Sequence, residues 1–82
     1  MVVRLRGKKC KLKYRPLGSI CGQRVPRCIT ISTDISGVMK LDTLLHEMMH
    51  ELFPKMVEAK IDQGATEMAA ILWDQGYRFM EI

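Results

Sequence analysis

The sequence contains few histidines, few aromatic residues and no long apolar run. Among its 82 residues there are two histidines and three cysteines, and aromatic residues make up 6%. No apolar run reaches the roughly 18 residues that a membrane-spanning helix requires, so we expect no contact with a membrane. No apolar stretch follows the basic N-terminus, which therefore does not resemble a signal peptide. A chain of this length favours a single domain, residues 1–82, with one small core.

The three cysteines are odd in number and are never spaced as Cys-x-x-Cys. Cys10, Cys21 and Cys28 are therefore predicted to be free thiols in a reducing compartment, which favours the cytoplasm. Cys21 and Cys28 could instead form a disulfide or contribute to a metal site. Their spacing, however, matches no recognisable ligand pattern.

The charges are divided sharply along the chain. Residues 1–33 hold nine Lys/Arg and no acid, whereas residues 34–82 hold four bases and nine acids, so the two parts carry +9 and −5. A basic half of this kind can indicate a nucleic-acid partner. The alternative is that the bases form the solvated face of a sheet, and the lack of an Arg-rich helix and of an aromatic cluster favours this alternative.

The first 35 residues are predicted to form the basic β part of the domain. Residues 2–6 and 10–14 alternate or nearly alternate in polarity around a short polar link, which indicates a hairpin. Residues 18–26 contain two Gly and one Pro and are predicted to be a loop. Residues 27–32 are rich in β-branched side chains and are predicted to be a third strand. We therefore expect a small antiparallel sheet of three strands.

Residues 36–82 are predicted to form the helical part. Apolar residues recur at spacings of three and four over about 38–52 and about 56–74, which indicates two helices. Pro54 and the short link around it predict an antiparallel hairpin. Gly64 lies inside the second helix and suggests close packing on the first. The expected order is β-β-β-α-α, an α+β domain with the helices laid against the sheet, in which Phe53, Trp73 and Phe79 pack.

The chemistry of the sequence is concentrated in His46-Glu47-Met48-Met49-His50, an HExxH pattern in the middle of the first predicted helix. Residues four apart lie on one helix face, so the imidazoles of His46 and His50 can bind the same Zn²⁺ ion. Glu47 can then accept a proton from a zinc-bound water as general base. A chance match is the alternative, but its frequency is on the order of one in several hundred for so short a chain with so few histidines.

A catalytic zinc usually has three protein ligands, and the sequence has no third histidine. In an antiparallel helix hairpin the start of the second helix lies level with His50, which favours Glu58 as the third ligand. Asp62, one turn later on the same face, can accept a hydrogen bond from the distal nitrogen of a ligating histidine.

Two other carboxylates fit the expected geometry less well. Glu67 lies roughly 13 Å beyond Glu58 along the helix axis, and Glu51 belongs to the helix that already supplies both histidines, so we expect it to be solvated. Glu58 and Asp62 have an alternative role too, as part of an exposed acidic face near Lys55 and Lys60.

Amide hydrolysis also requires a group that stabilises the developing oxyanion. Tyr77 is the candidate that we assign to the catalytic site, and Arg78 and Tyr14 are further candidates. The alternative for Tyr77 is a packing role beneath the helix hairpin.

Together, His46-Glu47-x-x-His50 and Glu58-x-x-x-Asp62 resemble the gluzincin branch of the zincin metallopeptidases. Similarity to small phage-encoded metallopeptidases extends over Leu41–His50, Leu52-Phe53-Pro54 and Leu72–Arg78. Seven residues separate His50 from Glu58, which is fewer than in most gluzincins. The resemblance implies a zinc peptidase with Glu47 as the base, a peptide paired with residues 28–32 as the edge strand, and the cytoplasm of a bacterium or phage-infected host.

Two functions follow as hypotheses. The first is a zinc-dependent metallopeptidase that acts on a peptide or protein substrate. The second is a non-catalytic zinc-containing module whose basic sheet docks nucleic acid or an acidic protein. The small size favours the second hypothesis, or a cleft completed by a partner or by self-association. The presence of Glu47, which a structural zinc site does not need, favours the first.

Overall fold

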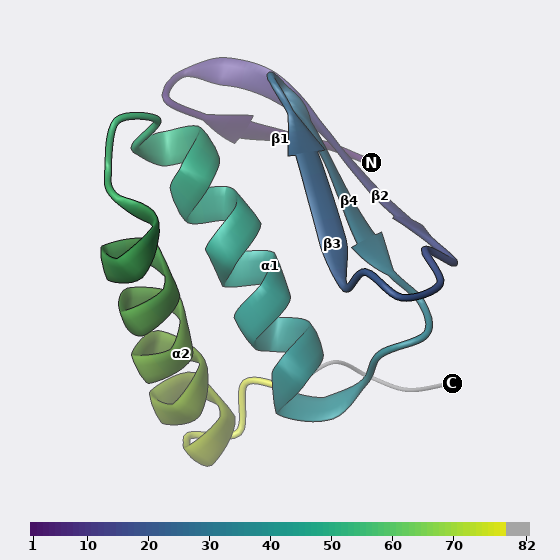
Figure 1. The fold of residues 1–82 in the computed structure, drawn as a ribbon, viewed down its shortest axis with the longest axis vertical. Coiled ribbons are helices and arrows are strands. Elements are labelled where there is room, and N and C mark those ends of the chain that lie inside the picture. The colour runs from purple at the N-terminus through teal and green to yellow at the C-terminus, as the bar shows by residue number, and fades with distance from the viewer. Residues whose placement is uncertain (79–82) are drawn as a thin grey trace.

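The computed structural model describes residues 1–78, which form one sheet followed by two helices on the same side of it (Figure 1). Phe79, which we expected to pack, lies outside the described residues. None of the described helices is long and apolar enough to cross a membrane. The elements are β1 (Val2–Leu5), β2 (Lys8–Arg15), β3 (Gly22–Val25), β4 (Cys28–Ser32), α1 (Gly37–Leu52) and α2 (Glu58–Asp74).

The prediction of a three-stranded antiparallel sheet was wrong. The sheet has four strands in the order β1-β2-β4-β3, and β3 occupies part of the segment that we predicted to be a loop. This extra strand reverses the chain once more, so β4 returns parallel to β2 and pairs with it. The consequence for the site is direct. β4 is an inner strand, so residues 28–32 are not the free edge that the family resemblance implied, and β3 takes the edge position.

Both antiparallel pairs of the sheet are hairpins with two-residue turns. β1 and β2 pair from Val2 opposite Lys11 to Leu5 opposite Lys8, and the turn residues Arg6 and Gly7 both have positive φ. Positive φ at both positions is typical of the type I′ turn, whose twist matches that of the flanking strands. β3 and β4 pair in the same antiparallel manner across the turn at residues 26–27.

The core lies between one face of the sheet and α1. Alternation along the strands turns a set of apolar side chains towards the helix, and the Lys/Arg side chains between them point to the opposite face. Three apolar side chains of α1, one turn apart, complete this core. The buried sheet residues are Leu5, Cys10, Leu12, Ile29 and Ile31, and the partners from α1 are Leu44, Met48 and Leu52.

The helices were predicted at nearly the right positions, but only one of them contacts the sheet. Within residues 1–78, α2 packs on α1 alone, so α1 lies between α2 and the sheet (Figure 1). The buried residues of α2, Ile61, Ala65 and Ala69, are therefore covered by α1. A Cβ on Gly64 would lie 3.2 Å from Cε of Met49, which confirms the expected close packing at this glycine. The third, remaining side of α1 stays open, and it carries the histidines.

Candidate metal centre

The two histidines project together from the open side of α1. Their Nε2 atoms lie 3.1 Å apart and their ring centroids 4.7 Å apart, so both imidazoles face the same point. The helix imposes this arrangement because residues four apart lie one turn apart on the same face. Both side chains remain about a quarter exposed, 23% for His46 and 24% for His50, which leaves the nitrogens accessible.

Glu58, the first residue of α2, brings its carboxylate to the same point. One oxygen lies 3.0 Å from Nε2 of His46, and the other lies 2.9 Å from Nε2 of His50. The three ligand atoms all lie within 4.8 Å of one another. A tetrahedral Zn²⁺ with bonds of about 2.0–2.1 Å would hold its ligand atoms roughly 3.3 Å apart. Small side-chain adjustments would therefore admit the ion.

Asp62 fixes the orientation of the first histidine. Its Oδ1 lies 2.9 Å from Nδ1 of His46, on the side of the ring away from Glu58. A neutral His46 whose Nδ1–H donates a hydrogen bond to Asp62 has a free lone pair on Nε2. This is the form of histidine that binds a metal. Asp62 lies one turn after Glu58 on α2, so the same helix face supplies both carboxylates.

These contacts contribute little to stability by themselves. The side chain of Glu58 is 60% exposed and that of Asp62 is 58% exposed. Ion pairs with this much solvent contact are worth about 0–1 kcal/mol each. Stabilisation of the helix pair is therefore a weak explanation for two histidines and two carboxylates around one point. The donor set of two imidazole nitrogens and one carboxylate suits zinc.

Glu47 lies beside this cluster but has a different environment. It is 7% exposed, and its Oε1 lies 3.8 Å from Nε2 of His46. Burial raises the pKa of Glu47 above its usual value, and the nearby His46, His50 and Arg24 oppose this shift without cancelling it. A carboxyl group with a raised pKa is better suited to hold a proton taken from a water molecule.

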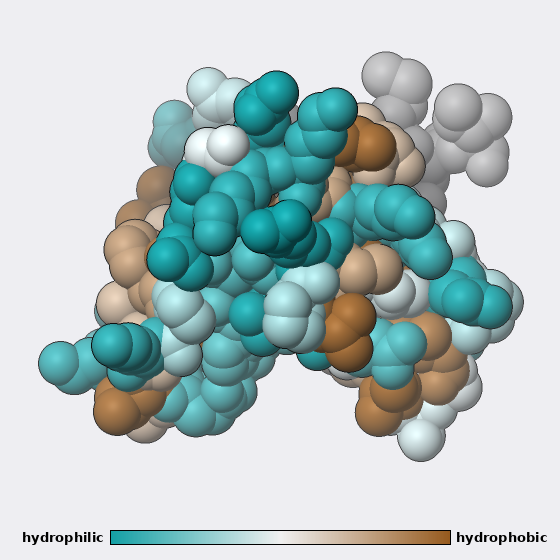
Figure 2. Space-filling model, turned by 90° about the horizontal axis from the view of Figure 1, so that it is seen from above, coloured by the Kyte–Doolittle hydropathy of each residue, from teal (hydrophilic) through white to brown (hydrophobic). Residues whose placement is uncertain are grey.

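Of the three candidate ligands, His46 lines a cavity of about 510 Å³ between α2 and the sheet, whereas His50 and Glu58 are not among the residues around it. His46 and Glu47 line it from α1, Asp62 lines it from α2, and residues 19–22 form the wall on the β3 side. Viewed from above, the molecule is hollowed between its helical side on the left and its sheet side on the right (Figure 2). The cavity is large enough for a residue of a bound peptide chain beside the metal-site residues.

Gly22 explains how β3 comes so near to the site. A Cβ at this position would lie 2.7 Å from Cγ2 of Thr43 and 3.5 Å from Cγ of Glu47. Only glycine allows this approach of the strand to α1. Sequence reasoning missed Gly22 and Thr43 as site residues. The glycine was the available signal, because an isolated glycine in a strand can mark the close approach of another backbone or element.

The expectation that Glu51 is solvated was wrong. It is 9% exposed, and its Oε1 accepts hydrogen bonds from Nε of Arg24 and from the backbone N–H of Arg27, each at 3.1 Å. Arg24 points from β3 towards α1 because it shares the inner sheet face with Ile29. Glu51 therefore ties the β3–β4 hairpin to the helix that carries the histidines.

The structure does not bring the oxyanion candidates to the histidines. Tyr77 and Arg78 line a separate cavity with Leu41 and Leu44, and Leu44 is about 200° around α1 from His46. Arg78 donates a hydrogen bond to the backbone oxygen of Trp73 at 3.1 Å and stacks on its ring. Tyr14 lies under the ammonium group of Lys40 instead.

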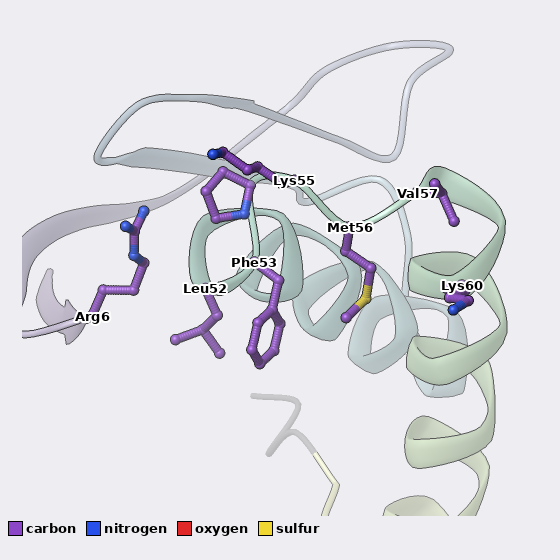
Figure 3. Close-up of a pocket in the computed structure, with 8 residues that line it drawn as sticks. Arg6, Leu52, Phe53, Lys55, Met56, Val57 and Lys60 are labelled. Carbon is purple, nitrogen blue, oxygen red and sulfur yellow. The ribbon is translucent and has the colours of Figure 1, made fainter.

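A larger cavity of about 580 Å³ lies at the link between α1 and α2 (Figure 3). Apolar side chains form much of its wall, including Phe53, which is 48% exposed rather than packed. Arg6, Lys55 and Lys60 add positive charge to this wall. None of the described residues around it is a histidine or an acid, so it offers neither metal ligands nor a general base.

The cysteines lie apart from the metal cluster. All three are free thiols: Cys10 is buried, Cys28 is half-buried in β4, and Cys21 is exposed in the wall of the site cavity.

Comparisons with family models, with curated proteins and with solved structures found no match to this chain.

Proposed function

We propose that this chain is a zinc-dependent metallopeptidase that hydrolyses peptide bonds. The observation that supports the proposal is the convergence of three donors from two helices, His46, His50 and Glu58, beside the buried carboxyl group of Glu47. A purely structural zinc site would not need Glu47. Glu47 lies next to the donors and its pKa is raised, and both features favour catalysis over the non-catalytic alternative.

Each residue has a separate task in this mechanism. Zinc held by His46, His50 and Glu58 would polarise the substrate carbonyl and lower the pKa of a water molecule towards about 7. Glu47 accepts the proton of that water as it attacks and passes it to the departing amine. Asp62 keeps the His46 ring in place by its contact with Nδ1. Tyr77, which we had expected to stabilise the oxyanion, lines a separate cavity and has no part in this mechanism.

The substrate in this proposal is an extended peptide that enters the cavity between β3 and α2. β3 is the edge of the sheet nearest to the site, and Gly22 brings its backbone close to Glu47. An edge strand offers unpaired backbone groups to an extended chain. The shallow walls of so small a domain favour flexible or unfolded substrates. The three free thiols support a reducing compartment such as the cytoplasm.

The test compares wild-type protein with Glu47→Gln on an unfolded protein substrate in the presence of zinc. General-base catalysis typically contributes about 10²–10⁴-fold, so we expect the variant to lose at least 100-fold in kcat/KM and to keep its zinc. Zinc content, measured on the same samples, separates loss of the base from loss of the metal. Equal rates in the two proteins would rule out catalysis by this site.

A further inference from the structure

A second feature of the molecule lies on the sheet face turned away from α1, which we call the outer sheet face. The side chains of β2 alternate, so the buried Cys10 and Leu12 face α1 while Lys9, Lys11 and Lys13 face outward. The register places Arg4 of β1 opposite Lys9, on the same outward side. The bases of β1 and β2 that share this face are Arg4, Lys9, Lys11, Lys13 and Arg15.

No described carboxylate neutralises this face. Residues 1–33 contain no acid, and no base of the outer sheet face forms an ion pair within residues 1–78. Arg24, which points to the inner face instead, is paired with Glu51. The charges are therefore divided: unpaired bases cover one side of the sheet, whereas residues 34–82 hold all nine acids of the sequence and carry a net charge of −5.

Part of the outer sheet face is concave. A hollow of about 280 Å³ is lined by Val2, Lys9, Cys10, Lys11 and Arg27. Three of these five residues are cations, and Arg27 reaches the hollow from the β3–β4 turn. The surface of this hollow is mostly apolar, so the hydrocarbon stems of these bases form much of its wall. Lysine and arginine side chains at such a position can each donate to a phosphate oxygen.

We propose that the outer sheet face binds the phosphate backbone of a nucleic-acid duplex. From Lys9 to Arg15 the bases extend over six residues of β2, about 20 Å at roughly 3.3 Å per residue. A duplex carries one charge per about 1.7 Å of its axis, so roughly a dozen phosphates lie along this length. The charges of the two surfaces are therefore opposite in sign over the same length.

The composition of the face favours a duplex over a single strand and over a membrane. Proteins that bind single strands commonly stack bases on aromatic side chains. The only aromatic residue of the four strands is Tyr14, which lies on the inner side. Surfaces that enter a membrane interface carry Trp, Phe or Leu beside their bases, and the outer sheet face has none. Binding by phosphate contacts alone is independent of base sequence.

This inference does not depend on the proposed peptidase activity. The outer sheet face is turned away from α1, which carries both histidines, and the two sites share no residue. Glu47→Gln should therefore leave duplex binding unchanged. Failure of the peptidase proposal and failure of duplex binding would appear in separate measurements.

The test is fluorescence anisotropy with a labelled DNA duplex of about 20 base pairs, titrated at NaCl concentrations from about 50 to 300 mM. Six phosphate contacts, from the five strand bases and Arg27, would give a slope of log K against log [NaCl] near −5. The double variant Lys11→Gln/Lys13→Gln should bind more weakly, and the magnitude of its slope should be smaller by about two because two phosphate contacts are lost. The matched control Lys55→Gln/Lys60→Gln removes the same charge from the helical part and should keep the wild-type slope.

Several results would overturn the proposal. These are no binding by wild-type protein at about 50 mM salt, equal losses in both double variants, or tighter binding of a single strand than of the duplex. If polyglutamate bound as tightly as the duplex, the face would be assigned to an acidic protein instead. If phosphatidylserine vesicles bound as tightly, it would be assigned to a membrane. If Lys11→Gln/Lys13→Gln does not fold, as judged by circular dichroism, Arg4→Gln/Lys9→Gln replaces it with the same expected change in slope.

Discussion

At the scale of single residues, spacing along a helix accounts for most of what could be predicted. His46 and His50 are four residues apart, as are Glu58 and Asp62, and each pair therefore shares a helix face whatever the rest of the fold does. A short connection between the helices was enough to bring the two pairs together. Glu51 was predicted wrongly because its burial depends on Arg24, which comes from a strand that the pattern did not reveal.

The role of Asp62 can be measured through zinc affinity. Asp62→Asn removes the carboxylate that holds Nδ1 of His46, so zinc affinity should fall by about 10–100-fold, measured by competition with a chromophoric chelator. The control is Glu67→Gln, which removes the same charge from an exposed position farther along α2. Equal affinities in the two variants would mean that Asp62 does not support the histidine.

The buried Glu47 predicts a pH dependence of stability in metal-free protein. Burial raises its pKa in the folded state, so the folded state binds more protons than the unfolded state in this range. The free energy of unfolding should therefore fall as the pH rises from the usual carboxyl pKa of 4.5 through the raised value. Glu47→Gln should lack this fall and be at least as stable at pH 7, as chemical denaturation at several pH values would show. A variant less stable than wild type at neutral pH would contradict this account of its burial.

At the scale of the elements, the helices were predictable and the sheet was not. Both helices carry long apolar stripes, and Pro54 lies in the link between them. β3 has only four residues, Gly-Gln-Arg-Val, without the alternation or β-branched content that indicates a strand. Missing this one strand also reversed the expected direction of β4 and assigned the free edge to the wrong strand.

The close approach of β3 to α1 predicts a specific effect at Gly22. A Cβ there would meet Cγ2 of Thr43 at 2.7 Å, so Gly22→Ala should lower the free energy of unfolding by about 1–3 kcal/mol. Thr43→Ser removes that methyl group and keeps the hydroxyl, which donates a hydrogen bond to the backbone oxygen of Met39. Chemical denaturation of the double variant should therefore show partial recovery. No recovery would mean that the cost of Gly22→Ala has another origin.

At the scale of the whole molecule, the site depends on the packing of α2 on α1. The histidines belong to one helix and Glu58 to the other, and within residues 1–78 α2 has no contact with the sheet. A metal bound at this point would therefore link the outermost helix to the rest of the fold. The chain order alone could not show this layering, because a helix hairpin can also lie with both helices on a sheet.

Zinc should consequently stabilise the folded molecule as a whole. A ligand at 100 times its Kd adds about 2.7 kcal/mol, which corresponds to roughly 10–20 °C in Tm for a domain of this size. Calorimetry with and without zinc would measure the shift for wild-type protein and for His50→Ala, which should show little of it. An equal shift in both proteins would place the zinc elsewhere in the molecule.

The central claim is that His46, His50 and Glu58 together hold one zinc ion. The most direct measurement is the zinc content and melting temperature of the protein purified without added metal, beside a His46→Ala/His50→Ala variant. The account predicts about one zinc per wild-type chain and almost none in the variant. Wild-type protein with almost no zinc, and with a melting temperature that added zinc leaves unchanged, would contradict it.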